Sequence, residues 1–135
     1  MCYPAAAEFR VVLDQPPTES LVQLENDIVE KYESLMIQAG DKQKQLRQQV
    51  RDRLSAVDVG LDQVAIQHGT SLRIIIIRTS LQQLEQLREH YNSGVLKDVL
   101  EAVFVLLSGR DVRISSAEWK EEQFEKCRRQ LICMY

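Results

Sequence analysis

The segment Leu72–Arg78, which reads LRIIIIR, constrains the fold of this chain more than any other part of the sequence. Its four consecutive isoleucines are β-branched and too few to cross a membrane, which favours a central strand covered on at least one face. Alternation along a strand sorts the run into two sets that point to opposite sides: Leu72, Ile74 and Ile76 on one, and Arg73, Ile75 and Ile77 on the other. The fold must therefore supply a sheet for this segment and a covering layer for at least one side.

Two helices are predicted directly after the isoleucine run. Ser80 followed by Gln83 forms a capping box at the start of the first, and Gly94 ends it. The apolar stripe of the first helix comprises Leu81, Leu84, Leu87 and Tyr91. The stripe of the second, which ends at Ser108-Gly109, comprises Leu96, Val99, Leu100, Val103, Phe104 and Leu107. The strand and these two helices form the predicted core.

The N-terminal half supplies a further strand and two more helices. Glu8–Leu13 alternates as a strand, with Phe9 on one side and Arg10 on the other. A helix is expected from an N-cap at Thr18 to a stop at Gly40, and a charged, Gln-rich, peripheral helix over Asp41–Val57. Their apolar positions are Leu21, Leu24, Ile28, Tyr32, Leu35 and Met36 in the first, and Leu46, Val50, Leu54 and Val57 in the second.

A change from helical to two-residue periodicity marks a hairpin. Gln63–Gln67 alternates, and His68-Gly69-Thr70 is short enough to turn it back into the isoleucine strand. A short strand is expected over Asp111–Ser115, and Ser115 with Glu118 forms a second capping box that would open a final helix. The buried candidates of that helix are Trp119, Phe124, Cys127 and Leu131.

This order of elements predicts an α+β fold, an α/β sandwich in which a four-stranded, mainly antiparallel sheet packs against about five helices. At 135 residues the chain is expected to form a single domain over residues 1–135, and residues 1–7 are a candidate for disorder.

Charge and cysteine content exclude some classes of function. With 17 basic and 20 acidic residues, the net charge of −3 gives no broad basic field for nucleic acid. Cys2, Cys127 and Cys133 lack the spacing of a zinc site and are odd in number, which suits a reducing compartment. The sequence shows no signal peptide and no run of membrane-spanning length, so we expect a cytoplasmic protein that does not bind membranes.

No constellation of catalytic, cofactor-binding or metal-binding residues stands out. His68 and His90 have no second ligand at metal spacing, and both are interpreted as surface or cap residues. Cys127 is expected on a buried helix face, where a cysteine acts as a small hydrophobe rather than a nucleophile. The basic positions Lys42, Lys44, Arg47, Arg51 and Arg53 contain no aromatic residue among them and are interpreted as a solvated helix face.

The segment Val64–Leu131 resembles the N-terminal domain of the death-domain adaptor TRADD. The resemblance rests on the isoleucine strand, the two core helices, the short strand that follows, and the Y-x-x-G-x-L pattern of Tyr91, Gly94 and Leu96. It implies a protein-recruiting module that docks a TNF-receptor-associated factor on the open face of its sheet.

On that resemblance the partner-binding residues would be Glu8, Arg10, Gln67, Arg73, Ile75 and Ile77. Glu8 and Arg10 stand where the family has aromatic residues. Strand alternation independently leaves Ile75 and Ile77 uncovered if helices pack on only one face, whereas the Asp41–Val57 helix or the N-terminal segment could instead cover them.

The sequence therefore predicts a non-enzymatic, cofactor-free adaptor domain in death-receptor-like apoptotic signalling or innate immunity. Its expected partner is a TNF-receptor-associated-factor-like adaptor, a receptor complex or a second copy of the chain, and not nucleic acid. Two alternatives stay open: a small-ligand or RNA-binding α+β domain that uses the sheet face, and a self-associating helical module formed by Thr18–Val57.

Overall fold

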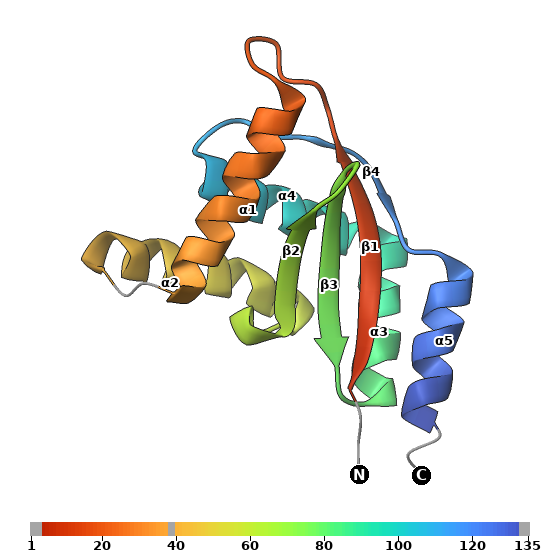
Figure 1. The fold of residues 1–135 in the computed structure, drawn as a ribbon. Helices are drawn as coiled ribbons and strands as arrows, with labels where there is room; N and C mark the ends of the chain where they lie inside the picture. The colour runs from red at the N-terminus through yellow and green to blue at the C-terminus, as the bar shows by residue number, and fades with distance from the viewer. Residues whose placement is uncertain (1–3, 38–39, 133–135) are drawn as a thin grey trace.

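The chain folds into one four-stranded sheet with helices packed against it (Figure 1). The computed structural model describes residues 4–37 and 40–132, and within them the chain forms four strands and five helices. The strands are β1 (Ala5–Leu13), β2 (Val64–His68), β3 (Leu72–Arg78) and β4 (Ile114–Glu118). The helices are α1 (Leu21–Ile37), α2 (Asp41–Leu54), α3 (Leu81–Ser93), α4 (Val95–Ser108) and α5 (Glu121–Ile132). The spatial order of the strands is β2-β3-β1-β4 and all neighbours are antiparallel, which confirms the predicted α+β fold.

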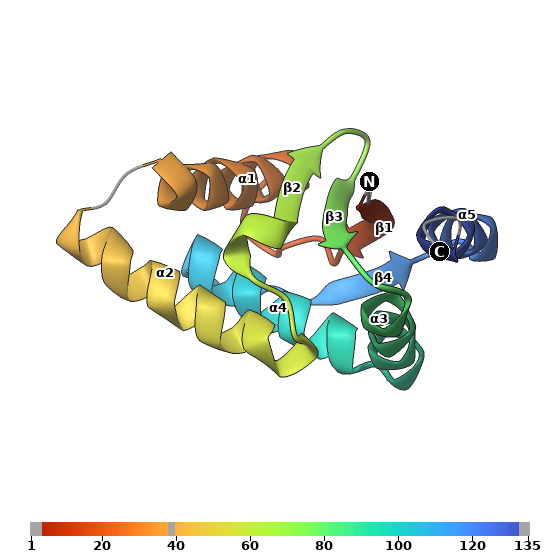
Figure 2. The same ribbon diagram turned by 90° about the horizontal axis from the view of Figure 1, so that it is seen from below.

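The helices lie on one side of the sheet and at its two flanks. In Figure 1, α3 and α4 lie behind the strands, and Figure 2 shows α2 against α4 on that same side. Helix α1 lies beside β2 and α5 lies beside β1. The helix predicted over Asp41–Val57 ends at Leu54 and continues as a short 3-10 helix over Ser55–Val57. The possibility that it covers the second face of the sheet is wrong, because α2 packs against α4 and α1.

The isoleucine strand occupies the centre of the sheet and alternates as predicted. Leu72, Ile74 and Ile76 are each 0% exposed and belong to the core that the helices share with the sheet. On the other side, Arg73 is exposed, and Ile75 and Ile77 are half-buried. In the adjacent β1, Phe9 and Val11 are buried and Arg10 is exposed, so both central strands present one apolar and one mixed face.

The turn between the two core helices depends on glycine. Gly94 has φ of 87°, the left-handed conformation that side chains with a Cβ adopt at a cost, and it joins α3 directly to α4. Ser80 caps α3, because its Oγ accepts a hydrogen bond from the backbone N–H of Gln83 at 3.1 Å. The Ser80 cap and the positive φ of Gly94 agree with the sequence prediction. The reciprocal half of the predicted capping box is absent, because the Gln83 side chain accepts from the backbone N–H of Thr79.

The N-terminal boundaries differ from the prediction. β1 begins at Ala5, and Ala5 and Ala7 are fully buried, so residues 5–7 are ordered strand rather than a disordered tail, because β3 supplies backbone partners as far as Arg78. Residues 1–3 lie outside the described residues. Ser20, not Thr18, accepts the capping hydrogen bond of α1, from the backbone N–H of Gln23.

The last strand and last helix begin later than predicted. Ser115–Glu118 matches a capping pattern, yet it is strand, because it pairs with β1 over Arg10–Val12 and this pairing satisfies its backbone. The predicted capping box at Ser115 is therefore wrong, and α5 begins at Glu121. Trp119 is buried as predicted, but it lies in the connection before the helix.

Candidate functional site

The six predicted partner-binding residues lie on one face of the sheet, opposite the helices. Backbone register places Glu8 beside Ile75, and Arg73 between Arg10 and Gln67. Four of the six are exposed, and the two isoleucines are half-buried. We call this surface the open face, and its members are Ala6, Glu8, Arg10, Val12, Ala65, Gln67, Arg73, Ile75, Ile77, Ser116 and Glu118. Figure 1 looks onto it: β2, β3 and β1 lie in front of α3 and α4.

The open face carries an aliphatic centre and a charged end. Ile75 lies between Ala65 and Glu8 in register, Ile77 lies beside Ala6, and both isoleucines are half-buried. The charged end lies near the β2–β3 turn and is hollowed into a pocket of about 460 Å³. The charged residues that line this hairpin pocket are Arg10, Arg73 and Lys120, together with Glu8 and Glu118. A partner could therefore meet aliphatic and ionic groups on the same surface.

His68 is not the free surface residue that the sequence suggested. Its Nε2 lies 3.1 Å from Oε1 of Glu25, whose side chain is only 4% exposed. A buried carboxylate needs such a partner, because desolvation without compensation is costly. The signal that could have indicated this contact is the position of Glu25, which falls within the apolar stripe of α1. His68 therefore anchors α1 to the end of β2.

Side chains of α5 form hydrogen bonds with the backbone of Ala6 and Glu8, in the part of β1 that does not pair with β4. Gln123 of α5 donates from Nε2 to the carbonyl of Ala6 at 2.8 Å, and its Oε1 accepts from the backbone N–H of Glu8 at 3.1 Å. The same oxygen accepts from Nε1 of Trp119 at 2.7 Å, and Cys127 Sγ donates to the Ala6 carbonyl at 3.3 Å. The Gln123 amide thus replaces a neighbouring strand, which protects this edge from pairing with another chain.

On each outer strand of the sheet, one backbone carbonyl accepts a hydrogen bond from a tyrosine hydroxyl. The Tyr91 hydroxyl accepts from the backbone N–H of Trp119 at 3.0 Å and donates to the carbonyl of Ala117 at 3.3 Å, next to β4. The Tyr32 hydroxyl lies 2.8 Å from the carbonyl of Leu61 and 3.1 Å from that of Val64, at the start of β2. Burial raises the pKa of Tyr32 to about 12. These contacts favour docking on the face of the sheet over strand addition at its edges.

Arg88 stacks within a cluster of aromatic side chains beneath β1. Its guanidinium carbon lies 5.1 Å from the ring centroids of Tyr91 and Trp119 and 4.9 Å from that of Phe124. The Trp119 ring also lies 4.6 Å from that of Phe9. Tyr91 therefore contributes to packing and to edge protection at once, which gives the Y-x-x-G-x-L pattern a structural role.

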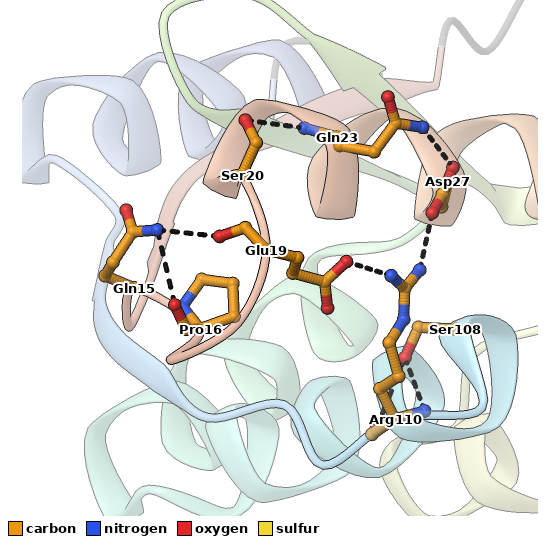
Figure 3. Close-up of polar contacts among 8 residues, drawn as sticks. All are labelled: Gln15, Pro16, Glu19, Ser20, Gln23, Asp27, Ser108 and Arg110. Atoms are coloured by element: carbon orange, nitrogen blue, oxygen red, sulfur yellow. Dashed lines mark hydrogen bonds and ion pairs between the residues drawn. The ribbon is translucent and has the colours of Figure 1, made fainter.

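A second charged cluster joins α1 to the loop before β4, away from the open face (Figure 3). Arg110 bridges Glu19 and Asp27, with its Nη2 2.5 Å from Oδ2 of Asp27. The hydrogen bond from Arg110, assisted by one from Gln23, lowers the pKa of Asp27 below its usual value. Each member of the cluster has a protein partner, so the cluster serves to hold α1 in place.

Among the residues that the structure describes, the remaining reactive and charged groups define no second site. Cys127 is free and buried, burial raises the pKa of its thiol, and Cys2 and Cys133 lie outside the described residues. Lys44, Arg51 and Arg53 are exposed on α2, as predicted for a solvated helix face, whereas Arg47 is half-buried and the Lys42 side chain lies outside the described part of the chain. Within residues 4–37 and 40–132, the structure shows no group of three potential metal ligands and no helix that is long and apolar enough to cross a bilayer.

Comparison with protein families, curated proteins and solved structures found no match to this chain. The resemblance to the TRADD N-terminal domain therefore stays a prediction from the sequence, and the argument for function rests on the open face itself.

Proposed function

We propose that this chain is a non-enzymatic protein-interaction domain that acts as an adaptor in death-receptor-like or innate-immune signalling in the cytoplasm. Its partner is a protein that presents aliphatic side chains to the open face, in the manner of a TNF-receptor-associated-factor-like adaptor. The observation that carries this proposal is the division of the isoleucine run, since Ile75 and Ile77 stay partly accessible while Ile74 and Ile76 are fully buried.

The composition of the open face supports a protein partner. An interface typically has an apolar centre surrounded by a polar rim, and a few central side chains supply most of its binding energy. Here Ile75 and Ile77 form the centre, and Glu8, Arg10 and Arg73 form the rim. The protected sheet edges favour recognition through these side chains.

The test is direct binding between purified proteins. Ile75→Glu combined with Ile77→Glu is compared by calorimetry with the unaltered domain for binding to purified receptor-associated-factor domains. Val22→Glu is the matched control, because Val22 is 56% exposed on α1, outside the open face. We expect a partner domain to bind the unaltered protein and the control, and to bind the double variant at least about tenfold more weakly.

Sedimentation of the domain alone tests the self-association alternative. We expect the unaltered domain to sediment as a monomer at concentrations where it binds its partner. A dimer that the double variant disrupts would assign the open face to a second copy of this chain. Unchanged partner binding by a folded double variant would contradict the proposal.

A further inference from the structure

A row of polar side chains crosses all four strands at the charged end of the open face. Register places Gln67 of β2 beside Arg73 of β3, Arg73 beside Arg10 of β1, and Arg10 beside Glu118 of β4. Directly opposed residues of antiparallel strands have Cβ atoms about 5 Å apart. Two arginine side chains therefore leave neighbouring positions on the two central strands, at the end of the sheet near the β2–β3 turn.

This arginine pair is unfavourable without an anion. Like charges directly opposite one another destabilise a sheet, and here an arginine stands on each central strand. Arg10 uses its Nε to donate to Ser71 Oγ at 3.1 Å. Among the described residues, the structure shows no hydrogen bond or ion pair to the terminal nitrogens of Arg10 or to any part of the Arg73 guanidinium. Both side chains are exposed and retain donors for a ligand.

The surroundings of the pair suit one compact anion. The hairpin pocket, about 460 Å³ in volume, is lined by both arginines and by Lys120, while His68 is already engaged by Glu25. Glu8 and Glu118 also line it and flank the arginines in register with Ile75 and Arg10. Acidic residues on both sides would repel an extended polyanion, whereas a single carboxylate can lie between the two guanidinium groups.

We propose that Arg10 and Arg73 bind a single carboxylate side chain of the partner protein, and that this contact fixes the partner's register on the open face. Guanidinium groups match carboxylates by paired hydrogen bonds that are stronger than neutral ones. The inference rests on the proposed function, because the same partner would place its aliphatic side chains on Ile75 and Ile77. Nucleic acid is the poorer ligand: the aromatic residue that lines the pocket, Phe9, is 1% exposed and offers no stacking surface.

The experiment measures fluorescence anisotropy with the full chain and three labelled probes. One is a short leucine-containing peptide with a single glutamate, the second is the same peptide with glutamine in place of that glutamate, and the third is a single-stranded RNA. The variants are Arg10→Gln, Arg73→Gln and the conservative Arg73→Lys. Arg129→Gln is the control, because it removes the same charge from an exposed position on α5.

We expect the acidic peptide to bind in preference to its neutral counterpart, with affinity that falls as salt is added. Arg10→Gln or Arg73→Gln should weaken binding about tenfold, Arg73→Lys less, and Arg129→Gln little. Arg73→Gln should not melt at a lower temperature than the unaltered protein, since it removes a repulsion and no hydrogen bond of the described residues. A purely structural role for the arginines would lower the melting temperature instead.

Equal affinity for the acidic and neutral peptides, or binding of RNA at lower concentration than the acidic peptide, would overturn the inference. The two proposals fail separately. If Ile75→Glu with Ile77→Glu abolishes partner binding but the arginine variants do not affect it, the adaptor proposal stands and the carboxylate site falls. If binding of the acidic peptide requires the arginines, but the double isoleucine variant binds the partner domain as tightly as the unaltered protein, the carboxylate site stands and the adaptor proposal falls.

Discussion

The two faces of the sheet differ in burial, although alternate residues of the same isoleucine run supply both. On the face toward α3 and α4, Ile74 and Ile76 are 0% exposed and lie in a continuous core with Phe9. On the open face, Ile75 and Ile77 are half-buried, with charged residues around them. The chain thus stabilises its fold with one half of an apolar run and leaves the other half accessible. The hydrophobicity of these isoleucines does not distinguish the two roles. The side of the strand on which each side chain lies does.

The core face should be the most sensitive to change. We expect Ile74→Glu to prevent folding, or to lower the free energy of unfolding by roughly 5 kcal/mol or more, because it buries an unpaired carboxylate and removes an isoleucine from the core. Ile75→Glu, one residue later, is the control. Urea denaturation measures the free energy of unfolding of both variants. An equal decrease for the two would show that the two faces do not differ in burial.

The protected edge of β1 should rank next. Gln123→Ala removes the partners of Ala6, Glu8 and Trp119, so we expect a loss of about 1–3 kcal/mol in the free energy of unfolding. It should also increase self-association, because it uncovers a strand edge. Gln130→Ala, at an exposed position of the same helix, should change neither property. A stable, monomeric Gln123→Ala variant would show that the amide is dispensable.

The turn that sets α3 against α4 should contribute less. Gly94→Val places a β-branched residue at φ of 87°, which we expect to lower the free energy of unfolding by about 1–2 kcal/mol. Gly94→Asn should cost less, since asparagine tolerates this conformation. A thermal melt that Gly94→Val leaves unchanged would contradict the positive φ at this turn.

The charged cluster around Arg110 should have the smallest effect and a defined pH dependence. Because the folded protein has a lowered pKa at Asp27, this group adds stability above its unfolded value of 3.8 and loses it as pH falls through the lower, folded value. Arg110→Gln should therefore slightly reduce stability near neutrality and reduce the loss on acidification. Unfolding curves measured above pH 3.8 and below the folded pKa of Asp27 check the direction of this pH dependence. A variant that is less stable than the unaltered protein only in acid would contradict the prediction.

The parts predicted correctly from the sequence are those governed by local periodicity and backbone constraint. The alternation of β3, the cap at Ser80 and the glycine turn at Gly94 each depend on a few neighbouring residues, and all are confirmed. The common face of the six candidate residues also follows from alternation, once the strands pair in the observed register.

Features that depend on distant contacts were not predictable in this way. Ser115–Glu118 has the local pattern of a helix start, and only pairing with β1 makes it a strand. Arg78 is 1% exposed at the end of the isoleucine strand, because Asp58 and Gln63 supply oxygens to its guanidinium. The opposition of Arg10 and Arg73 likewise requires the exact pairing of two strands that are far apart in the sequence.

The most direct test of the division between the faces is the free energy of unfolding of two double variants of one isoleucine run. Ile75→Glu with Ile77→Glu changes the open face, and Ile74→Glu with Ile76→Glu changes the core face by the same chemistry. We predict that the first folds and loses no more than about 1–2 kcal/mol, and that the second does not fold. If the open-face variant also unfolds, the run is buried on both sides and the open face cannot be the binding surface.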